Sequence, residues 1–118
     1  MKKITSKISF LAITLSLFLF AFQSNVIAKD IRKDTVEVSG NCEMCQKRIV
    51  TAATVKGVKY VNWSPETKLM TIKYDNDIIT LDEIEQRIAK VGHDTPLHQA
   101  DDKVYEELDD CCKYDRKE

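Results

Sequence analysis

The sequence predicts an α+β fold of the ferredoxin-like kind, a sandwich with the element order β-α-β-β-α-β and a short C-terminal helical tail. Two observations support this prediction. Short runs rich in strand-forming residues are interspersed with two longer runs whose apolar residues recur with helical spacing. The three glycines of the 118-residue chain, at positions 40, 57 and 92, all fall at boundaries between these runs.

The first three elements are predicted within residues 35–63. Residues 35–38 alternate between polar and apolar and predict a strand that ends near Gly40. A helical pattern starts at Glu43, with apolar residues at 49, 52 and 53 on one face, and we expect Gly57 to end this helix. Residues 58–63 are rich in strand formers and predict the second strand.

The last three elements are predicted within residues 64–97. A turn with Pro65 at its second position joins the second strand to an alternating run at 68–74, so the two strands form a hairpin. Thr80 and Glu83 form a capping box that opens a second helix, and Gly92 ends it. Residues 93–97 predict a short last strand, which Pro96 confines to a sheet edge.

Residues 1–28 predict a secretory signal peptide. They contain three of the 18 basic residues and none of the 19 acidic ones, and an apolar run at 8–22 precedes small or aliphatic residues that end at Ala28. This run is shorter than the ~20 residues that span a bilayer, which favours cleavage after Ala28 over a retained anchor. We therefore expect an exported protein, periplasmic or secreted and not stably inserted in a membrane, in a compartment where thiols can be oxidised.

The predicted mature chain, residues 29–118, is one small acidic unit. It keeps 15 basic and 19 acidic side chains, a net charge of −4. A negative chain without a basic run has no electrostatic footprint for nucleic acid, and 90 residues leave no room for a second catalytic domain. We divide it into a domain at 29–97 and an acidic tail with a cysteine pair at 98–118.

The chemistry of the sequence lies in the motif Cys42-Glu43-Met44-Cys45. The motif falls where a strand-ending loop meets a helix, and unpaired N–H groups at a helix start favour thiolates. Two thiolates do not fill the four-coordinate shell of structural zinc, but they suit Cu(I). A structural disulfide, a redox pair and half of a zinc site use the same motif, so the motif alone leaves these alternatives open.

In this context the sequence resembles the heavy-metal-associated domain, a family of small copper chaperones, metal-pump domains and periplasmic mercury-binding proteins. The resemblance covers residues 34–96 and rests on three segments: 40–45 (GNCEMC), 56–58 (KGV) and 90–93 (KVGH). It implies a ferredoxin-like fold in which Cys42 and Cys45 bind one Cu(I) or a similar soft ion for transfer. This chain departs from the family in having Gly40 where a methionine is usual, and in a stretch before Gly57 that is about one residue shorter.

Three other side chains near the motif have alternative predicted roles. His93 is a possible third ligand or a hydrogen-bond partner of a thiolate, or else a histidine that faces solvent. Met44 offers a thioether, although an apolar cover for the loop is the role we favour. His98 lies in the linker to the tail, where we expect no role.

Cys111 and Cys112 are possible additional ligands in the tail. Adjacent cysteines bridge each other poorly, so they are predicted either to bind metal or to pair with Cys42 and Cys45. A tail folded over the loop would supply up to four thiolates and convert a transfer site into a storage or sensing site. The tail also carries an acidic cluster, which is either a solvated face or a surface that attracts a basic partner. Its members are Asp101, Asp102, Glu106, Glu107, Asp109 and Asp110.

The sequence thus predicts a non-enzymatic, exported carrier or sequestering chaperone for Cu(I), which exchanges metal with a membrane transporter or another metal-binding domain. The alternatives are binding of Hg(II) or Zn(II), and a thiol–disulfide oxidoreductase in which Cys42 attacks and Cys45 resolves. The hairpin between the two helices does not match the thioredoxin order. Hydrolase and nucleotide-binding roles lack the necessary residues.

Overall fold

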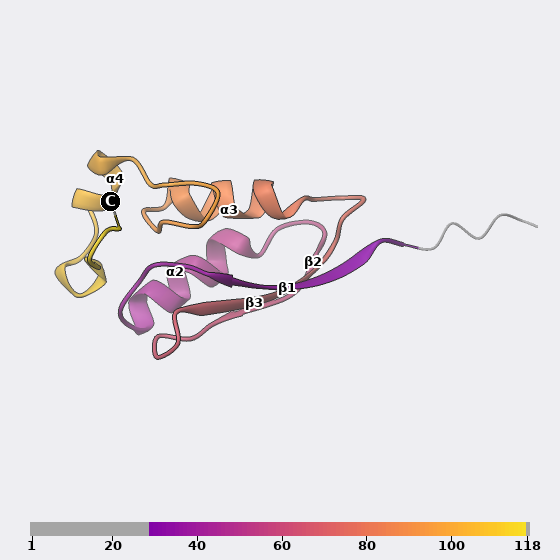
Figure 1. Cartoon of the computed structure of the whole chain (residues 1–118), viewed down its shortest axis with the longest axis horizontal. Coiled ribbons are helices and arrows are strands. Elements are labelled where there is room, and N and C mark those ends of the chain that lie inside the picture. Colours follow the sequence, from indigo (N-terminus) through magenta and orange to yellow (C-terminus); the bar gives the residue numbers. More distant parts are fainter. Residues whose placement is uncertain (1–28, 118) are drawn as a thin grey trace, which may run out of the picture.

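The computed structural model describes residues 29–117, and the predicted signal peptide at 1–28 lies outside them. Strands β1 (Ile31–Glu37), β2 (Val58–Trp63) and β3 (Leu69–Asp75) form an antiparallel sheet in the order β1-β3-β2. Helices α2 (Glu43–Ala53) and α3 (Leu81–Lys90) accompany it, and a tail with α4 (Asp102–Glu106) and the short helix η1 (Asp110–Cys112) lies at one end (Figure 1). This architecture confirms the α+β, ferredoxin-like class.

The core lies between one face of the sheet and the two longer helices. Met70, Ile72 and Tyr74 alternate along β3 and are buried, whereas Lys73 between them is exposed. Ile49 of α2 and the stripe on α3 belong to the same apolar cluster. Burying each large aliphatic side chain contributes about 1.5–3 kcal/mol, so this cluster fixes the position of α2 and of the loop before it.

The local signals in the sequence correspond to real elements. β2 and β3 form the predicted hairpin, with Trp63 opposite Met70. Thr80 and Glu83 make both hydrogen bonds of the capping box at the start of α3. β1 begins at Ile31, four residues before the predicted start, because its polar first half pairs with β3 from Ile31 opposite Asp75 onward.

The predicted end of the first helix is wrong. α2 ends at Ala53 rather than at Gly57, because the Thr54 hydroxyl bonds back to the Val50 carbonyl and the backbone then leaves the helix. Gly57 instead has a φ of +99° in the turn that leads into β2. Side-chain atoms of Ile78 and Ile79 would lie within 3.0 Å of a Cβ at Gly57, so the position requires glycine for space as well as for conformation.

The predicted sixth element is also wrong, because residues 93–97 form no strand. Pro96 has no N–H to donate, and the Thr95 N–H donates to the His98 carbonyl at 2.8 Å, which closes a local turn. Asp94 alone keeps a sheet-like contact, accepting a hydrogen bond from the Ser39 N–H at 3.0 Å. The residues described therefore contribute three strands, and the chain passes from this turn into the tail.

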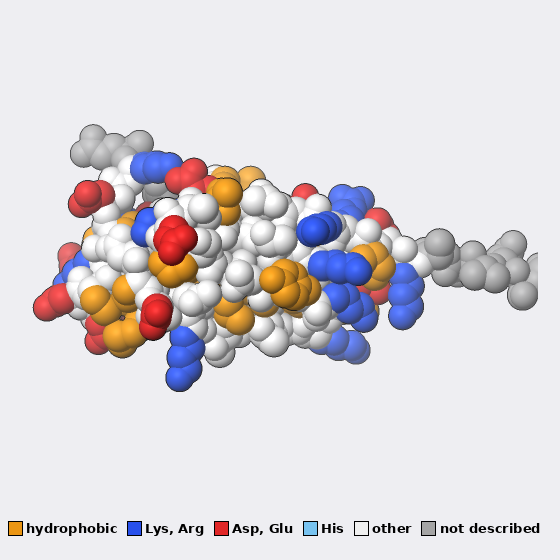
Figure 2. Space-filling view, turned by 90° about the horizontal axis from the view of Figure 1, so that it is seen from below, with side chains coloured by type: hydrophobic (Ala, Val, Ile, Leu, Met, Phe, Trp, Pro, Cys, Tyr) orange, Lys and Arg blue, Asp and Glu red, His pale blue; other side chains and the backbone are white. Residues whose placement is uncertain are grey.

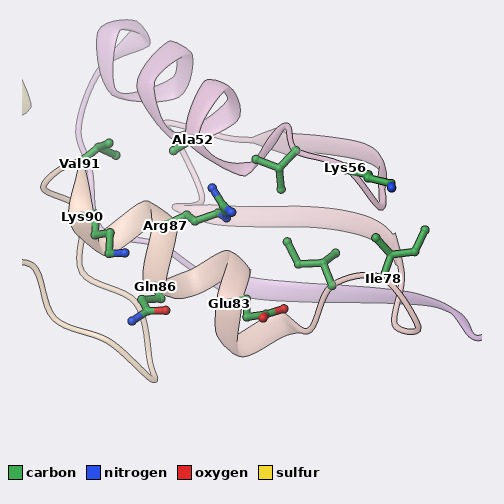
Figure 3. Close-up of a pocket in the computed structure, with 10 residues that line it drawn as sticks. Ala52, Lys56, Ile78, Glu83, Gln86, Arg87, Lys90 and Val91 are labelled. Carbon is green, nitrogen blue, oxygen red and sulfur yellow. The ribbon is translucent and has the colours of Figure 1, made fainter.

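The surface is electrically uneven along the molecule. Figure 2 shows Lys and Arg side chains gathered toward the start of β1 and Asp and Glu side chains toward the opposite end, where the tail lies. A groove of about 600 Å³ lies beside α3, with Ala52, Ile78 and Val91 as apolar lining and Lys56 and Arg87 among its charged residues (Figure 3). No cysteine lines this groove. None of the helices formed by residues 29–117 combines the length and apolar character needed to cross a membrane.

Candidate metal centre

The two cysteines of the motif lie at the start of α2. Cys42 is the N-cap residue, with extended backbone (φ −132°, ψ 176°), and its carbonyl accepts the first helical hydrogen bond from Gln46. Cys45, one turn into the helix, faces the core and is fully buried, whereas Cys42 is half-buried. The Asn41 N–H points at the Cys45 sulfur at 3.5 Å, so the helix start supplies a donor to the sulfurs.

The structure brings the tail cysteines to this motif. The Cys42 sulfur lies 3.4 Å from that of Cys45, 3.3 Å from that of Cys112 and 3.2 Å from that of Cys111. The sulfurs of Cys42, Cys45 and Cys112 all lie within 4.8 Å of one another; we call these three residues the inner sulfur group. All four cysteines are free thiols, so the tail is not attached by a disulfide.

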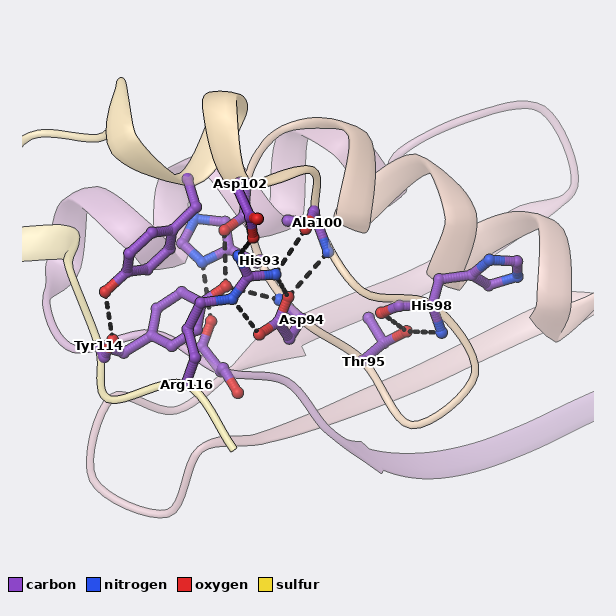
Figure 4. A network of polar contacts seen from close by, with 11 residues as sticks. His93, Asp94, Thr95, His98, Ala100, Asp102, Tyr114 and Arg116 are labelled. Carbon is purple, nitrogen blue, oxygen red and sulfur yellow. Dashed lines mark hydrogen bonds and ion pairs between the residues drawn. The ribbon is translucent and has the colours of Figure 1, made fainter. Parts of the chain in front are cut away.

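Polar contacts that involve no sulfur hold the tail in place (Figure 4). The Tyr114 hydroxyl donates to the Gly92 carbonyl at 2.7 Å and accepts from the Asp94 N–H at 2.9 Å. Arg116 binds the Asp94 carboxylate with two nitrogens, at 3.0 and 2.8 Å. Directly after η1, the Asn41 side chain donates to the Lys113 carbonyl at 2.7 Å. These contacts hold the segment that carries Cys112 against the motif.

The environment divides the thiols into one that ionises readily and two that resist ionisation. Burial opposes ionisation of Cys42, but hydrogen bonds with the Cys45 N–H and with the Cys111 and Cys112 thiols lower its pKa to about 6. Hydrogen bonding to Cys42 raises the pKa of Cys111. Burial first, and then hydrogen bonds to Cys45 and Cys42, raise the pKa of Cys112. Binding a metal through all of these sulfurs therefore releases protons.

Arg48 brings positive charge to the buried side of the centre. Its guanidinium lies beside Cys112, where it favours the thiolate of that residue. One nitrogen pairs with Asp109 at 3.5 Å, while Nη1 is buried without a partner. A cation in this position offsets part of the negative charge that several thiolates concentrate.

His93 lies in the core rather than at the surface. It is fully buried, so the solvent-facing alternative is wrong. Its Nδ1 lies 2.8 Å from the Ser39 carbonyl, which fixes Nδ1–H as the donor, and its ring stacks on Tyr114 at 5.9 Å. Burial first, and then the charge of Arg48, lower the pKa of His93. No histidine nitrogen of residues 29–117 belongs to the inner sulfur group.

His98 also lies apart from the sulfurs. Its Nε2 is 2.8 Å from an Asp82 carboxylate oxygen at the start of α3.

Trp63 fills the space under the metal loop where the resemblance leads one to expect a methionine side chain. Gly40 is buried against its ring, and a Cβ at Gly40 would lie 3.0 Å from two ring carbons and 3.2 Å from the Cys45 Cβ. The indole N–H donates to the Val38 carbonyl at 2.9 Å, which fixes the ring. The glycine and the tryptophan therefore form one packing unit that supports Cys45.

Sequence reasoning missed the residues that hold the tail, namely Asn41, Tyr114 and Arg116. Each acts through a partner far away in the chain, and periodicity and spacing carry no signal for such contacts. Gly40 could have indicated the packing of Trp63, because a glycine in place of the family's methionine beneath the loop leaves space that a large side chain from elsewhere must fill.

No protein-family profile and no curated protein matches this sequence. Among solved structures, the CopZ metallochaperone aligns with a TM-score of 0.52 at 20% identity, over 54% of this chain and 98% of its own. A "putative copper-ion-binding protein" from Bacillus anthracis str. Ames aligns with a TM-score of 0.55 at 23% identity, over 58% and 99%. The chain has the heavy-metal-associated fold. Oxidized MerP from Ralstonia metallidurans CH34 also matches, with a TM-score of 0.48 at 22% identity over 58% and 100%.

The heavy-metal-associated fold accounts for a little over half of the chain. That part covers nearly all of CopZ and of the Bacillus protein, so the rest of this chain is additional to the shared fold. The predicted fold is confirmed, and the meeting of the tail with the motif is a feature of this chain's own structure.

Proposed function

We propose that this protein binds Cu(I) through the thiolates of Cys42, Cys45 and Cys112 and carries or sequesters it outside the cytoplasm. The observation that carries the proposal is the inner sulfur group, three free thiols within 4.8 Å of one another. The fold and the copper-related names of two structural neighbours support a metal-binding role.

The geometry favours Cu(I) over Zn(II). Structural zinc takes four ligands arranged as a tetrahedron, whereas Cu(I) accepts a soft, low-coordinate sulfur site. Cys111 touches Cys42 but is not within 4.8 Å of every member of the inner sulfur group, so the four sulfurs do not close a tetrahedron. Hg(II) is equally thiophilic and is the second ion to test.

A third thiolate favours retention of the ion over rapid transfer. The polar contacts of Tyr114 and Arg116 hold Cys112 in place, so this ligand costs little ordering when the metal binds. We therefore favour the sequestering role over that of a fast carrier. The acidic cluster of the tail, close to the sulfurs, would suit a basic face on a transporter or another metal-binding domain.

The test is an anaerobic titration of reduced residues 29–118 with Cu(I), Zn(II) and Hg(II) against a chromophoric competitor. We expect tight Cu(I) binding that the Cys42→Ser/Cys45→Ser double variant abolishes and the Cys112→Ser variant weakens. His98→Gln, remote from the sulfurs, is the matched control and should bind like the wild type. If the Cys42/Cys45 double variant binds Cu(I) as tightly as the wild type, the assignment is wrong.

A thiol–disulfide oxidoreductase is the second candidate, because Cys42 has a lowered pKa and a second thiol 3.4 Å away. We propose that the protein is not an enzyme, since the buried Cys45 is enclosed by the domain and Cys112 lies over Cys42. An insulin-reduction assay separates the two functions. Sustained turnover by the metal-free protein would overturn the binding role.

Export is proposed from residues 1–28 alone. When the full chain is produced in a bacterial host, we expect the mature protein in the periplasmic fraction with Lys29 as its first residue. N-terminal sequencing of that fraction is the measurement. An intact N-terminus in the cytoplasmic fraction would contradict the proposal.

A further inference from the structure

Two sulfur atoms beside the inner sulfur group have no role in the proposed function. The Cys111 sulfur lies 3.5 Å from the Met44 thioether sulfur, 3.2 Å from that of Cys42 and 3.9 Å from that of Cys112. Cys111 is exposed and Met44 is 50% exposed. The five sulfurs therefore form a continuous group that runs from the buried core to the surface.

Met44 is not serving as a core residue. It lies in the first turn of α2, outside the buried cluster, and it directs its thioether at a thiol contributed by the tail. Thioethers and thiolates are the soft ligands that select Cu(I). Met44 and Cys111 are 67 residues apart in the chain, yet the fold brings their exposed sulfurs together. A thioether and a thiol side by side are two soft ligands of the kind that a Cu(I) site uses.

We propose that Cys111 and Met44, together with the Cys42 thiolate as a bridging ligand, form a second soft-metal position, so that one chain holds two Cu(I) ions. The inner ion takes the inner sulfur group, and the outer ion takes Cys42, Cys111 and Met44. The inference rests on the proposed function, because the outer position uses a ligand of the inner one. Each cysteine binds as a thiolate and gives its proton to solvent, and the oxidation state of copper does not change.

The position of Cys42 makes it the bridging ligand. It is the one cysteine whose sulfur lies within 3.4 Å of the other three cysteine sulfurs. A thiolate sulfur carries several lone pairs and can bind two soft ions at once. Cys45, fully buried on the core side, has no such access to the outer position.

Charge balance permits the second ion. An inner Cu(I) with three thiolates keeps a net negative charge, which Arg48 offsets in part. An outer Cu(I) brings one positive charge, the Cys111 thiolate brings one negative charge, and the Met44 thioether is neutral. Filling the outer position therefore adds no net charge to the centre, which avoids the usual cost of accumulating charge at a partly buried site.

Anaerobic Cu(I) titration of reduced residues 29–118, followed by native mass spectrometry and X-ray absorption, tests the proposal. We expect monomers with two Cu(I) ions and copper–copper scattering in the absorption spectrum. Cys111→Ser and Met44→Leu should lose the second equivalent while retaining the first with unchanged competition. Met70→Leu, which alters a thioether buried in the core, is the matched control and should still bind two.

The outcomes distinguish this inference from the proposed function. If the wild type binds one Cu(I), or if two ions occur only in dimers, or if Cys111→Ser still binds two, the outer position is refuted while the inner site stands. If the wild type binds no Cu(I), the proposed function fails as well. Far-UV circular dichroism of each variant checks that it is folded, and the exposure of Cys111 and Met44 makes both substitutions structurally mild.

Discussion

At the scale of single residues, the centre depends on how closely a few side chains are packed beneath it. Gly40 and Trp63 fit together so closely that a single added carbon would meet ring atoms at 3.0 Å. The ring cannot move aside easily, because it is fully buried and bonded to the Val38 carbonyl. Because Gly40 has no side chain, the Trp63 ring and Cys45 can both pack against its backbone without being displaced.

Gly40→Ala should lower the free energy of unfolding by about 1–3 kcal/mol, the usual cost of overpacking a well-filled core. Urea unfolding followed by tryptophan fluorescence is the measurement, and Glu66→Ala in the exposed hairpin turn is the control. A variant as stable as the wild type would show that the ring has room to shift.

His93 makes the stability of the metal-free protein depend on pH. Because burial lowers its folded-state pKa below the ordinary 6.5, the unfolded chain protonates first as the pH falls. Stability should therefore be fully present above about pH 6.5 and should decrease below it, down to the lowered folded-state pKa. Urea unfolding at several pH values measures this slope.

The slope should be smaller in His93→Phe and unchanged in His98→Gln. The phenylalanine variant loses the hydrogen bond to Ser39 and is less stable at every pH, so the comparison is between slopes rather than absolute values. An equal slope in His93→Phe would assign the pH dependence to other groups.

At the scale of elements, the tail docks on the domain through residues other than the cysteines that we propose as metal ligands. Tyr114→Phe removes the hydroxyl that serves the Gly92 carbonyl and the Asp94 N–H, which should destabilise the docked state by about 1–3 kcal/mol. The buried Cys112 should then react faster with an alkylating reagent in the metal-free protein, as measured by mass spectrometry. Tyr60→Phe, at an exposed position on β2, should leave that rate unchanged.

Elements that form through contacts between neighbours in the chain follow from local sequence patterns, whereas those that depend on side-chain hydrogen bonds or remote partners do not. The hairpin at 58–75 and the capping box at Thr80 follow from contacts between neighbours in the chain, and local patterns predict such contacts. The end of α2 and the turn at 95–98 depend on side-chain hydrogen bonds of Thr54 and Thr95, which compete with regular structure in ways that a pattern does not rank. The spacing of Cys42 and Cys45 predicts that their sulfurs lie together, whereas the docking of Cys112 depends on Tyr114 and Arg116, whose partners are remote in sequence.

At the scale of the whole molecule, the proposed function predicts that the acidic tail and the domain cooperate to slow metal release. Removing a coordinating thiolate should weaken retention by more than the about 10- to 100-fold that the loss of a supporting residue typically costs. Cys112→Ser should accordingly transfer Cu(I) to a competing chelator faster than the wild type in stopped-flow measurements. The Thr51→Ser variant, on the exposed side of α2, should match the wild type. Equal rates for Cys112→Ser and the wild type would remove the tail from the site.

The sulfurs of Cys42 and Cys112 come from positions 70 residues apart, and only the folded domain brings them to 3.3 Å. A chain that is still being made has the first pair of thiols well before the third, because Cys112 follows Cys45 only after a long stretch of chain. Under the proposed function, the third ligand becomes available only when that stretch has been made and the Tyr114 and Arg116 contacts have docked it. The sequence separation of the ligands would thereby couple the timing of metal capture to folding.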